Sequence, residues 1–368
     1  MSADRPNRHL TVKEATTMVV VGADVHKRTH TFVAVDEVGR HLGEKVVKAT
    51  TAGHQQAVRW ARTQFGIELV WAIEDCRHLS ARLERDLLTA GQKVVRVPPK
   101  LMAQTRASAR TRGKSDPIDA LAVARAFLRE PDLPVASHDE MSRELKLLVD
   151  RREDLVGQRT STINRLLWRV HELDPERAPK PRSLDLAKHR RLLADWLATQ
   201  SGLVAELARD ELADITRLTE QINMLAKRIG ERVRAIAPPA LLAMPGCAEL
   251  TAAKVIGETA GVTRFKNEAA FARHSGVAPI PVWSGNTAGR VRMTRSGNRQ
   301  LNAALHRIAV TQIRLDGLGQ AYYRHRLAEG DSPTEALRCL KRRLARVVFH
   351  HLHTDHQTRQ QPCQPAAA

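Results

Sequence analysis

Short runs of β-branched residues alternate with polar turns and helix-like segments over the first 130 residues. Alternation at every second position predicts strands, and a spacing of three or four predicts helices. The expected elements are three strands of an antiparallel meander over 19–23, 31–35 and 44–48, a helix over 52–64, a strand over 68–74, a helix over 79–88, a strand over 93–97 and a helix over 116–128. Pro98-Pro99 is expected to break the chain. The order βββαβαβα predicts an α/β fold, with a mixed sheet flanked by helices.

The hydrophobic period changes between residues 139 and 236. Val149, Val156, Ile163 and Val170 recur every seven residues, and a second segment steps three and four residues at a time through Ile215, Leu218, Ile222, Leu225 and Ile229. Such heptads predict two long helical arms, separated by the proline-bearing stretch 174–181. Two interpretations remain open. The arms form a helical hairpin within one domain, or they form a coiled coil that dimerises the protein.

The chain after Pro238-Pro239 is basic and is expected to be mostly helical as far as residue 352. A Gln-, Pro- and Ala-rich tail follows, with the composition of a disordered segment. The predicted organisation is a catalytic domain over 17–132, a helical arm over 139–236, a C-terminal domain over 238–352 and a disordered tail over 353–368.

Composition narrows the class of partner. The 368 residues are 42% hydrophobic, enough to bury real cores, and carry a formal net charge of +19. A charge that large favours a polyanion, of which nucleic acid is the commonest. No apolar stretch is long enough for a transmembrane helix, so no membrane partner is expected. The four scattered cysteines form no Cys-x-x-Cys pair, which favours the reducing cytoplasm, in association with the nucleoid.

Four carboxylates stand where predicted elements begin or end. Asp24 closes the first strand, Glu74 closes the strand after the first helix, and Asp116 and Asp119 lie three residues apart at the start of a helix. Asp75 follows Glu74 directly, so either acid could occupy that position. Acids gathered at one sheet edge repel one another unless cations bind there, and Mg²⁺ prefers such oxygen ligands. Two ions, with Mn²⁺ as a possible substitute, can stabilise both oxygens of a phosphodiester displacement. Together with the βββαβαβα order, this resembles a RuvC-like member of the RNase H superfamily.

Two basic segments predict contact with nucleic acid. No acid occurs between Asp86 and Asp116, and a basic loop is expected to lead into the helix that bears the paired aspartates. No acid occurs between residues 269 and 315 either, a span that includes Ser284-Gly285 in a proline-rich loop. A Pro-Gly turn before a predicted helix further resembles half of a helix-hairpin-helix, which presents backbone amides to a phosphate. The expected nucleic-acid contacts are Arg106, Arg110, Arg112, Lys114, Gly246, Arg290, Arg292, Arg295, Asn298 and Arg299.

Taken together, four blocks resemble the DEDD insertion-sequence transposases of the IS110 group. They are Gly22-Ala-Asp24-Val-His-Lys27, Lys114-Ser-Asp116-Pro-Ile-Asp119-Ala120, Met244-Pro-Gly246, and Ser284-Gly285 with Arg295-Ser-Gly-Asn-Arg299. The resemblance implies a RuvC-like domain, a coiled coil and a C-terminal serine domain. It also implies that Asp24, Glu74, Asp116 and Asp119 bind the metal, that Ser284 is the nucleophile, and that a structured non-coding RNA guides the enzyme to DNA.

The sequence therefore predicts a DNA transposase or site-specific recombinase that acts as a homo-oligomer, a dimer or a dimer of dimers. A serine hydroxyl is a poor nucleophile without a base or metal. The active site is accordingly expected to combine Ser284 with the four acids, from the same chain or from a partner's. Two alternatives are a RuvC-like structure-specific endonuclease that uses water, for which Ser284 would be superfluous, and an inactive DNA-binding relic.

Overall fold

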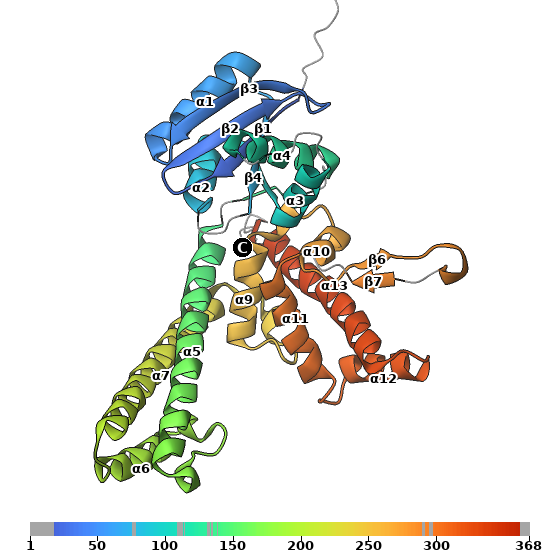
Figure 1. Cartoon of the computed structure of the whole chain (residues 1–368). Coiled ribbons are helices and arrows are strands. Elements are labelled where there is room, and N and C mark those ends of the chain that lie inside the picture. Colours follow the sequence, from blue (N-terminus) through green and yellow to red (C-terminus); the bar gives the residue numbers. More distant parts are fainter. Residues whose placement is uncertain are drawn as a thin grey trace, which may run out of the picture. The chain divides into compact units, whose positions relative to one another are not determined.

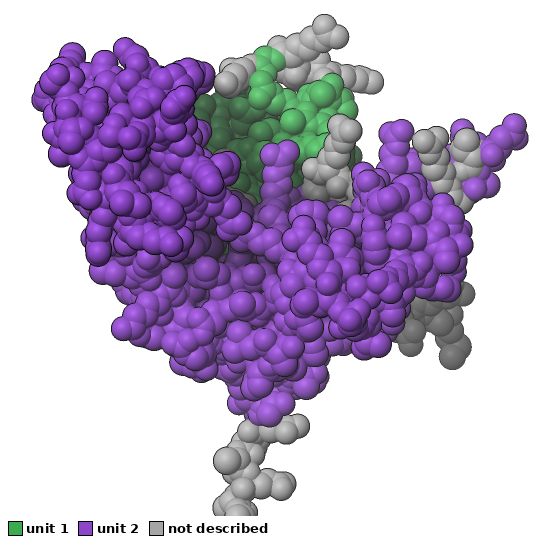
Figure 2. Space-filling model, turned by 90° about the horizontal axis from the view of Figure 1, so that it is seen from below, with its two compact units in different colours: residues 1–138 green, residues 139–368 purple. Residues whose placement is uncertain are grey.

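The computed structural model describes residues 18–75, 79–108, 113, 115–130, 133, 135–137, 139–288, 291–293 and 297–360. The chain divides into two compact units, residues 1–138 and residues 139–368, which Figure 2 distinguishes by colour. The first unit holds the mixed sheet, and the second unit holds the helical arm together with the C-terminal region.

The first unit is built on a five-stranded sheet in the order β3-β2-β1-β4-β5 (Figure 1). Its strands are β1 (Val19–Val25), β2 (Thr29–Val35), β3 (His41–Lys48), β4 (Leu69–Glu74) and β5 (Lys93–Val97). β1, β2 and β3 pair antiparallel, whereas β4 is parallel to both β1 and β5. The predicted meander and the α/β class with a mixed sheet are confirmed.

Helices cover both faces of this sheet because apolar residues alternate between its faces. On one face, Val21, Trp71 and Val94 share a core with α1 (Thr51–Phe65) and α2 (Ala81–Thr89). On the other face, Val20 and Val95 pack against α4 (Asp116–Arg129). These helices match the predicted ones closely. A further helix, α3 (Pro99–Ala107), lies where Pro98-Pro99 was predicted to break the chain. The strand β5 does end before Pro98-Pro99, as predicted, but the helix that follows was not predicted; proline is tolerated in the first turn of a helix, where no backbone N–H is needed.

The arm of the second unit is a hairpin of two long helices, α5 (Glu140–Leu173) and α7 (Leu203–Ile236), with the shorter α6 (Ala187–Ala198) between them (Figure 1). Leu155 of α5 packs against Leu218 and Ile222 of α7 in a buried cluster. The arms therefore pair within one chain, as the hairpin interpretation predicts. Val156, predicted to lie in the seam, is 38% exposed, and its neighbour Leu155 is buried instead. The strict seven-residue count missed this shift, because a straight helix drifts relative to an exact heptad.

The C-terminal region is mostly helical, as predicted. Its helices are α8 (Pro239–Leu242), α9 (Glu249–Thr259), α10 (Glu268–His274), α11 (Arg299–Gln312), α12 (Leu318–Ala328) and α13 (Pro333–Gln360). A short hairpin of β6 (Pro279–Pro281) and β7 (Val291–Met293) joins α10 to α11. The helix α13 continues past the predicted end at residue 352, so the predicted tail is helical as far as Gln360.

The base of the arm and the C-terminal helices share one hydrophobic core. Leu145 and Val149 of α5 and Val233 of α7 lie in the same buried cluster as Val255 of α9 and Leu305 of α11. The arm is therefore continuous with the C-terminal region in its packing, and the division into 139–236 and 238–352 remains a prediction about the domains. Among the helices within the described ranges, none is long and apolar enough to cross a membrane.

Candidate active site

Asp24 and Glu74 lie at equivalent positions on adjacent parallel strands. Ala23 of β1 pairs with Ile73 of β4, so the next residue on each strand is one of these acids. Side chains alternate along a strand, and Val20 and Val70 face α4. Asp24 and Glu74 follow each of these valines by four residues, so they belong to the same face. The sheet thus places both acids at one edge, on the side covered by α4.

Close packing of α4 on β1 brings a second pair of acids to this edge. A Cβ atom at Gly22 would lie 2.7 Å from the backbone nitrogen of Ala124, so only glycine allows the helix backbone this close. Asp116 is the first residue of α4 and is followed by Pro117, which suits a first helical turn. The same helix start thus projects Asp116 and Asp119 from its first turn.

Three side chains form a compact group at this edge. His26 Nε2 lies 3.1 Å from Asp24 Oδ2 and 3.3 Å from Asp116 Oδ1. One potential ligand atom from each of the three residues lies within 4.8 Å of the others. His26 was not among the predicted site residues. Its spacing of two from Asp24, at the end of a strand, was the signal that could have placed it on the same face.

Burial makes the charge of Asp24 costly. Asp24 is buried, whereas Asp116 is exposed. Burial is the largest cause that raises the pKa of Asp24 above its usual value, and the nearby carboxylates Asp119 and Asp116 raise it further. His26 opposes this shift. A cation beside these acids would stabilise the charged form of Asp24 against both effects.

The other two predicted ligands stand apart from this group. Among the described residues, neither Glu74 nor Asp119 belongs to the group of three ligand atoms. Asp119 forms an ion pair with Arg106, whose Nη1 lies 3.0 Å from Asp119 Oδ1. Asp119 nevertheless lies in the same first turn of α4 as Asp116. Glu74 shares the strand edge, so the four predicted acids occupy one region, with two of them in the compact group.

The basic segment before α4 differs from the loop that was predicted. Lys100 and Arg106 lie on the helix α3, and Arg96 lies on β5. Arg96 donates from Nε and Nη2 to the carboxylate of Glu84, at 2.5 and 2.6 Å. One arginine of this acid-free segment is thus neutralised within the unit. Three predicted contacts lie outside the described residues: Arg110, Arg112 and Lys114.

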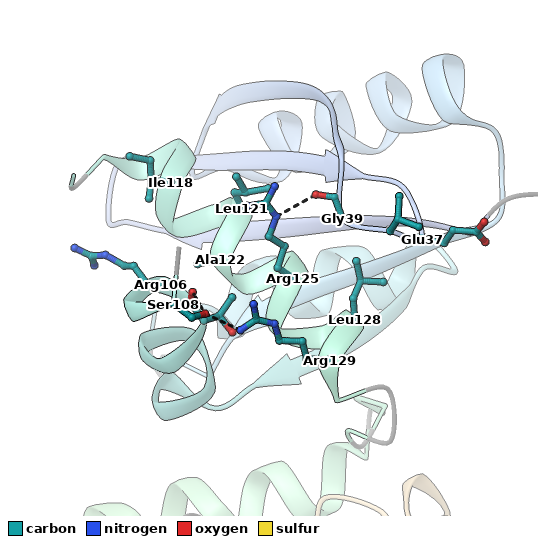
Figure 3. A pocket seen from close by; sticks show the side chains of 12 residues that line it. Glu37, Gly39, Arg106, Ser108, Ile118, Leu121, Ala122, Arg125, Leu128 and Arg129 are labelled. Atoms are coloured by element: carbon teal, nitrogen blue, oxygen red, sulfur yellow. Dashed lines mark hydrogen bonds between the residues drawn. The ribbon is translucent and has the colours of Figure 1, made fainter. Parts of the chain in front are cut away.

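A groove of about 520 Å³ lies beside this region, between α3, α4 and the turn after β2 (Figure 3). Arg125 and Arg129 line it, but both guanidinium groups already have partners. Arg125 Nε donates to the carbonyl oxygen of Gly39 at 3.0 Å, and Arg129 Nη1 donates to Ser108 Oγ at 2.9 Å. These bonds hold α4 against the turn after β2 and against α3. The arginines of the groove therefore have a structural role, and no ligand is needed to explain them.

The donor set at the sheet edge fits a divalent cation. Carboxylate oxygens suit Mg²⁺ and Mn²⁺, and an imidazole nitrogen suits Mn²⁺ better than Mg²⁺. Asp24 and Asp116 provide the oxygens, and His26 provides the nitrogen. A buried carboxylate close to further acids is the environment in which a bound cation lowers the electrostatic cost most.

Ser284 lies in the second unit, between β6 and a short 3-10 turn that begins at Gly285. It is exposed, as is Arg292 on β7. Ser275, one of the nearest other serines in sequence, is 0% exposed, and its hydroxyl donates to the carbonyl oxygen of Ala272. Exposure thus favours Ser284 over Ser275 as a group that reaches DNA. Two further predicted contacts lie outside the described residues: Arg290 and Arg295.

Gly297 and Asn298, which follow the hairpin, pack closely against the turn after α10. A Cβ atom on Gly297 would lie 2.7 Å from the backbone of Gly276, and the Asn298 N–H donates to the carbonyl oxygen of His274 at 2.6 Å. Asn298 Oδ1 caps α11 by accepting from two backbone amides, while its Nδ2 donates to the buried Glu258. Asn298 is therefore held by the protein itself, whereas its neighbour Arg299 is exposed.

Gly246 also has a packing role. It has a φ of +87°, and a Cβ there would lie 2.8 Å from Thr311 and 3.0 Å from Ile308 of α11. The turn before α9 thus needs glycine for close contact with α11. Its predicted phosphate contact remains a prediction.

Comparisons with known proteins cover both units. Residues 21–173 match the family model of the IS110-type DEDD transposase, and residues 239–324 match the transposase family IS116/IS110/IS902. The uncharacterized 42 kDa protein of insertion element IS900 from Mycobacterium paratuberculosis is 26% identical over 380 residues, covering 90% of this chain and 94% of that protein. The uncharacterized 44.8 kDa protein of IS116 from Streptomyces clavuligerus is also 26% identical, over 89% of this chain and 93% of its own.

Among solved structures, the chain is similar to Thermus thermophilus RuvC in complex with a Holliday junction substrate. That similarity has 17% sequence identity and a TM-score of 0.26, and it covers 32% of this chain and 99% of RuvC.

Proposed function

Because the chain belongs to the IS110 family of transposases, enzymes that cut and recombine DNA, we propose that it exchanges DNA strands with a metal-bound carboxylate site and the Ser284 nucleophile. The observation that carries this proposal is the convergence of Asp24, His26 and Asp116 at one sheet edge. Glu74 and Asp119 would complete the metal site from the same region.

The divalent ion, Mg²⁺ or Mn²⁺, would stabilise the negative charge that develops on phosphorus and on the oxygens that enter and leave. Asp24 and Asp116 would hold it, and His26 would orient Asp24 or bind the ion directly. Arg106 restrains Asp119 in the ion pair described above. These residues would thus fix the position of the positive charge that stabilises the transition state.

Ser284 would attack the phosphorus of a DNA phosphodiester. Its Oγ–P bond forms as the bond from phosphorus to a deoxyribose oxygen breaks, and the hydroxyl proton passes to a base while the departing oxygen gains a proton. The product is a phosphoserine ester, which keeps the energy of the original bond. A deoxyribose hydroxyl of another strand then reverses the step, so rejoining needs no ATP. We propose that the serine depends on the acids for its activation, since no carboxylate lies between residues 269 and 315.

Two alternatives predict different products. A nuclease that used the acids alone would release DNA with water as the nucleophile, and Ser284 would then have no role. A relic would bind DNA without cleaving it. The exposure of Ser284 in a segment free of carboxylates supports the recombinase.

We further propose that the enzyme acts as a dimer or dimer of dimers directed by a structured non-coding RNA. The resemblance to the IS110 group implies this RNA, and the net charge of +19 supports a nucleic-acid partner without distinguishing RNA from DNA. Sequencing the nucleic acid that copurifies with the protein tests this point. One defined RNA is expected, whereas a random mixture of host RNA would contradict it.

Denaturing gels of labelled DNA test the proposed function. The wild-type protein should give a protease-sensitive DNA adduct in the presence of Mg²⁺ or Mn²⁺, and chelation should abolish it. Ser284→Ala and Asp24→Ala should both lack the adduct while still binding DNA. Ser201→Ala is a matched control, because Ser201 is another exposed serine of the second unit. Cleavage without any adduct would support the nuclease, and an adduct in Ser284→Ala would remove this serine from the reaction.

A further inference from the structure

The residue before the proposed nucleophile is an exposed tryptophan. Trp283 is 55% exposed, and its neighbours Ile280, Val282 and Val291 in the β6–β7 hairpin are exposed as well. Exposing a large aromatic surface to water is unfavourable unless a partner covers it. The hairpin projects from the helices of its unit (Figure 1), and the exposure of these side chains leaves them accessible to a partner.

Most of the other tryptophans are buried or packed against a neighbouring side chain, whereas Trp283 is exposed. Trp71 is fully buried, Trp60 packs edge to face against Phe65, and Trp196 lies beside the guanidinium of Arg177. Trp168 on α5 is the other highly exposed tryptophan, at 74%. Trp168 lies in the arm, where acids accompany the bases: Arg169, for example, pairs with Glu211 at 3.0 Å.

The charge around Trp283 favours a polyanion over a protein surface. No carboxylate occurs between residues 269 and 315, so the hairpin has no acidic residue of its own beside its arginines. Arg292 pairs across the hairpin with Ile280 and is exposed. A partner that covers an aromatic ring and also neutralises arginine must combine flat apolar faces with negative charge. Nucleotides have both.

The backbone of the hairpin is restrained in β6 and is held at its C-terminal end. Pro279 and Pro281 restrict the backbone of β6, which lowers the entropy lost when the segment becomes ordered. At the other end, Gly297 and Asn298 are fixed to the turn after α10 and to Glu258. The tip of the hairpin can therefore present Trp283 and Ser284 from a fixed base.

We propose that Trp283 stacks on an unpaired DNA base next to the phosphate that Ser284 attacks. This inference rests on the proposed role of Ser284 and specifies its substrate as a strand with at least one unstacked nucleotide. Stacking on the tryptophan would hold the adjoining phosphate beside the serine hydroxyl, because the two residues are consecutive. Duplex DNA cannot make this contact without unstacking a base.

Equilibrium binding tests the stacking contact without any chemistry. The full chain is titrated, in the presence of a chelator, against fluorescein-labelled oligo(dT) of 20 nucleotides and against a duplex of equal length. Trp283→Ala should weaken oligo(dT) binding at least about fivefold, the lower end expected for loss of one base–aromatic stack. Trp283→Phe should recover much of the loss, and duplex binding should change less than about twofold. Trp168→Ala is the matched control and should bind both probes as the wild type does.

Equal oligo(dT) affinity of Trp283→Ala and the wild type would overturn the proposal. If the variant also had a lower mass than the wild type in light scattering, the hairpin would be a protein–protein contact instead. The proposed function is judged separately, by the Ser284-dependent adduct. An adduct without a stacking effect overturns only the role of Trp283, and a stacking effect without an adduct overturns only the serine chemistry.

Discussion

A Cβ atom on Gly22 would lie 2.1 Å from the carbonyl oxygen of Ala120, a separation that no side chain can adopt. Gly22 is on β1, two residues before Asp24, and Ala120 is on α4, one residue after Asp119. The close approach of strand and helix thus sets the distance between the acids of the sheet and those of the helix. The contact between Gly22 and Ala120 therefore affects both the packing of α4 on the sheet and the geometry of the candidate metal site.

Gly22→Ala should therefore disturb both stability and metal binding. The new methyl group meets backbone atoms of α4 that cannot turn away, so the free energy of unfolding of the first unit should fall by roughly 3 kcal/mol. Thermal unfolding with and without MnCl₂ measures both effects, and stabilisation by the metal should also be reduced. Gly157→Ala is the control: it lies in α5 with open space around it, and should stabilise its helix by about 0.5–1 kcal/mol. Wild-type stability in Gly22→Ala would contradict this role of the contact.

Asp24→Asn should stabilise the metal-free protein. The buried carboxylate has a raised pKa because of burial and of the nearby Asp119 and Asp116, so its charge costs stability at neutral pH. A neutral amide of the same shape should raise the melting temperature in chelator by about 4 °C. The variant should also lose the further stabilisation that MgCl₂ or MnCl₂ gives the wild type. An identical response of both proteins to metal would exclude Asp24 as a ligand.

Glu74 can be tested against an acid near the opposite end of the same strand. Glu74 closes β4, whereas the exposed Glu68 directly precedes it. Glu74→Gln should weaken Mn²⁺ binding at least about tenfold in calorimetric titration, because a charged ligand is lost. Glu68→Gln should bind as the wild type does. Should Glu74→Gln keep its affinity, His26 would take the place of Glu74 among the ligands.

The strands of the sheet were predictable because the local alternation of apolar and polar residues defines each of them. Alternating apolar residues define β1 to β5, and the parallel pairing of β1 with β4 places Asp24 and Glu74 at one edge. The ion pair between Arg106 and Asp119 was not predictable. It depends on α3 forming after Pro98-Pro99 and on its packing beside α4, both of which are tertiary effects. A count of basic residues could not separate those that face phosphate from those that neutralise an acid within the fold.

The role of Asn298 escaped prediction for a related reason. Its sequence context, Ser-Gly-Asn-Arg in a basic span, indicates nucleic-acid contact. In the structure its side chain caps α11 and also bonds to the buried Glu258, which lies forty residues earlier in the chain. The side-chain amide of Asn298 thus bonds to a buried carboxylate that is distant in sequence, and a local sequence pattern does not show this contact. The family resemblance supplied the order of blocks but not these partners.

Acid should weaken the first unit through His30. This side chain is buried and stacks on His54, and burial and the neighbouring His54 lower its pKa from 6.5 to about 4. The unfolded chain therefore binds a proton at a higher pH than the folded one. The stability contributed by neutral His30 is complete above pH 6.5 and is lost as the pH falls toward 4.

Urea unfolding at pH 7.5, 6 and 5 measures this effect. His30→Phe keeps an aromatic ring but cannot titrate, so its stability should fall less than that of the wild type over this range. His41→Phe replaces an exposed histidine of β3 and should follow the wild type. Parallel curves for His30→Phe and the wild type would show that His30 does not cause the acid sensitivity.

Mapping the DNA–protein bond by mass spectrometry tests the central claim most directly. The wild-type protein is reacted with DNA and Mn²⁺, then digested with nuclease and trypsin. The peptide over residues 274–290 contains two serines, the buried Ser275 and the exposed Ser284. A nucleotide should be attached to Ser284, and Asp24→Ala should yield none. Attachment to another residue, or DNA cleavage with no modified peptide, would contradict a serine recombinase that depends on the carboxylate site.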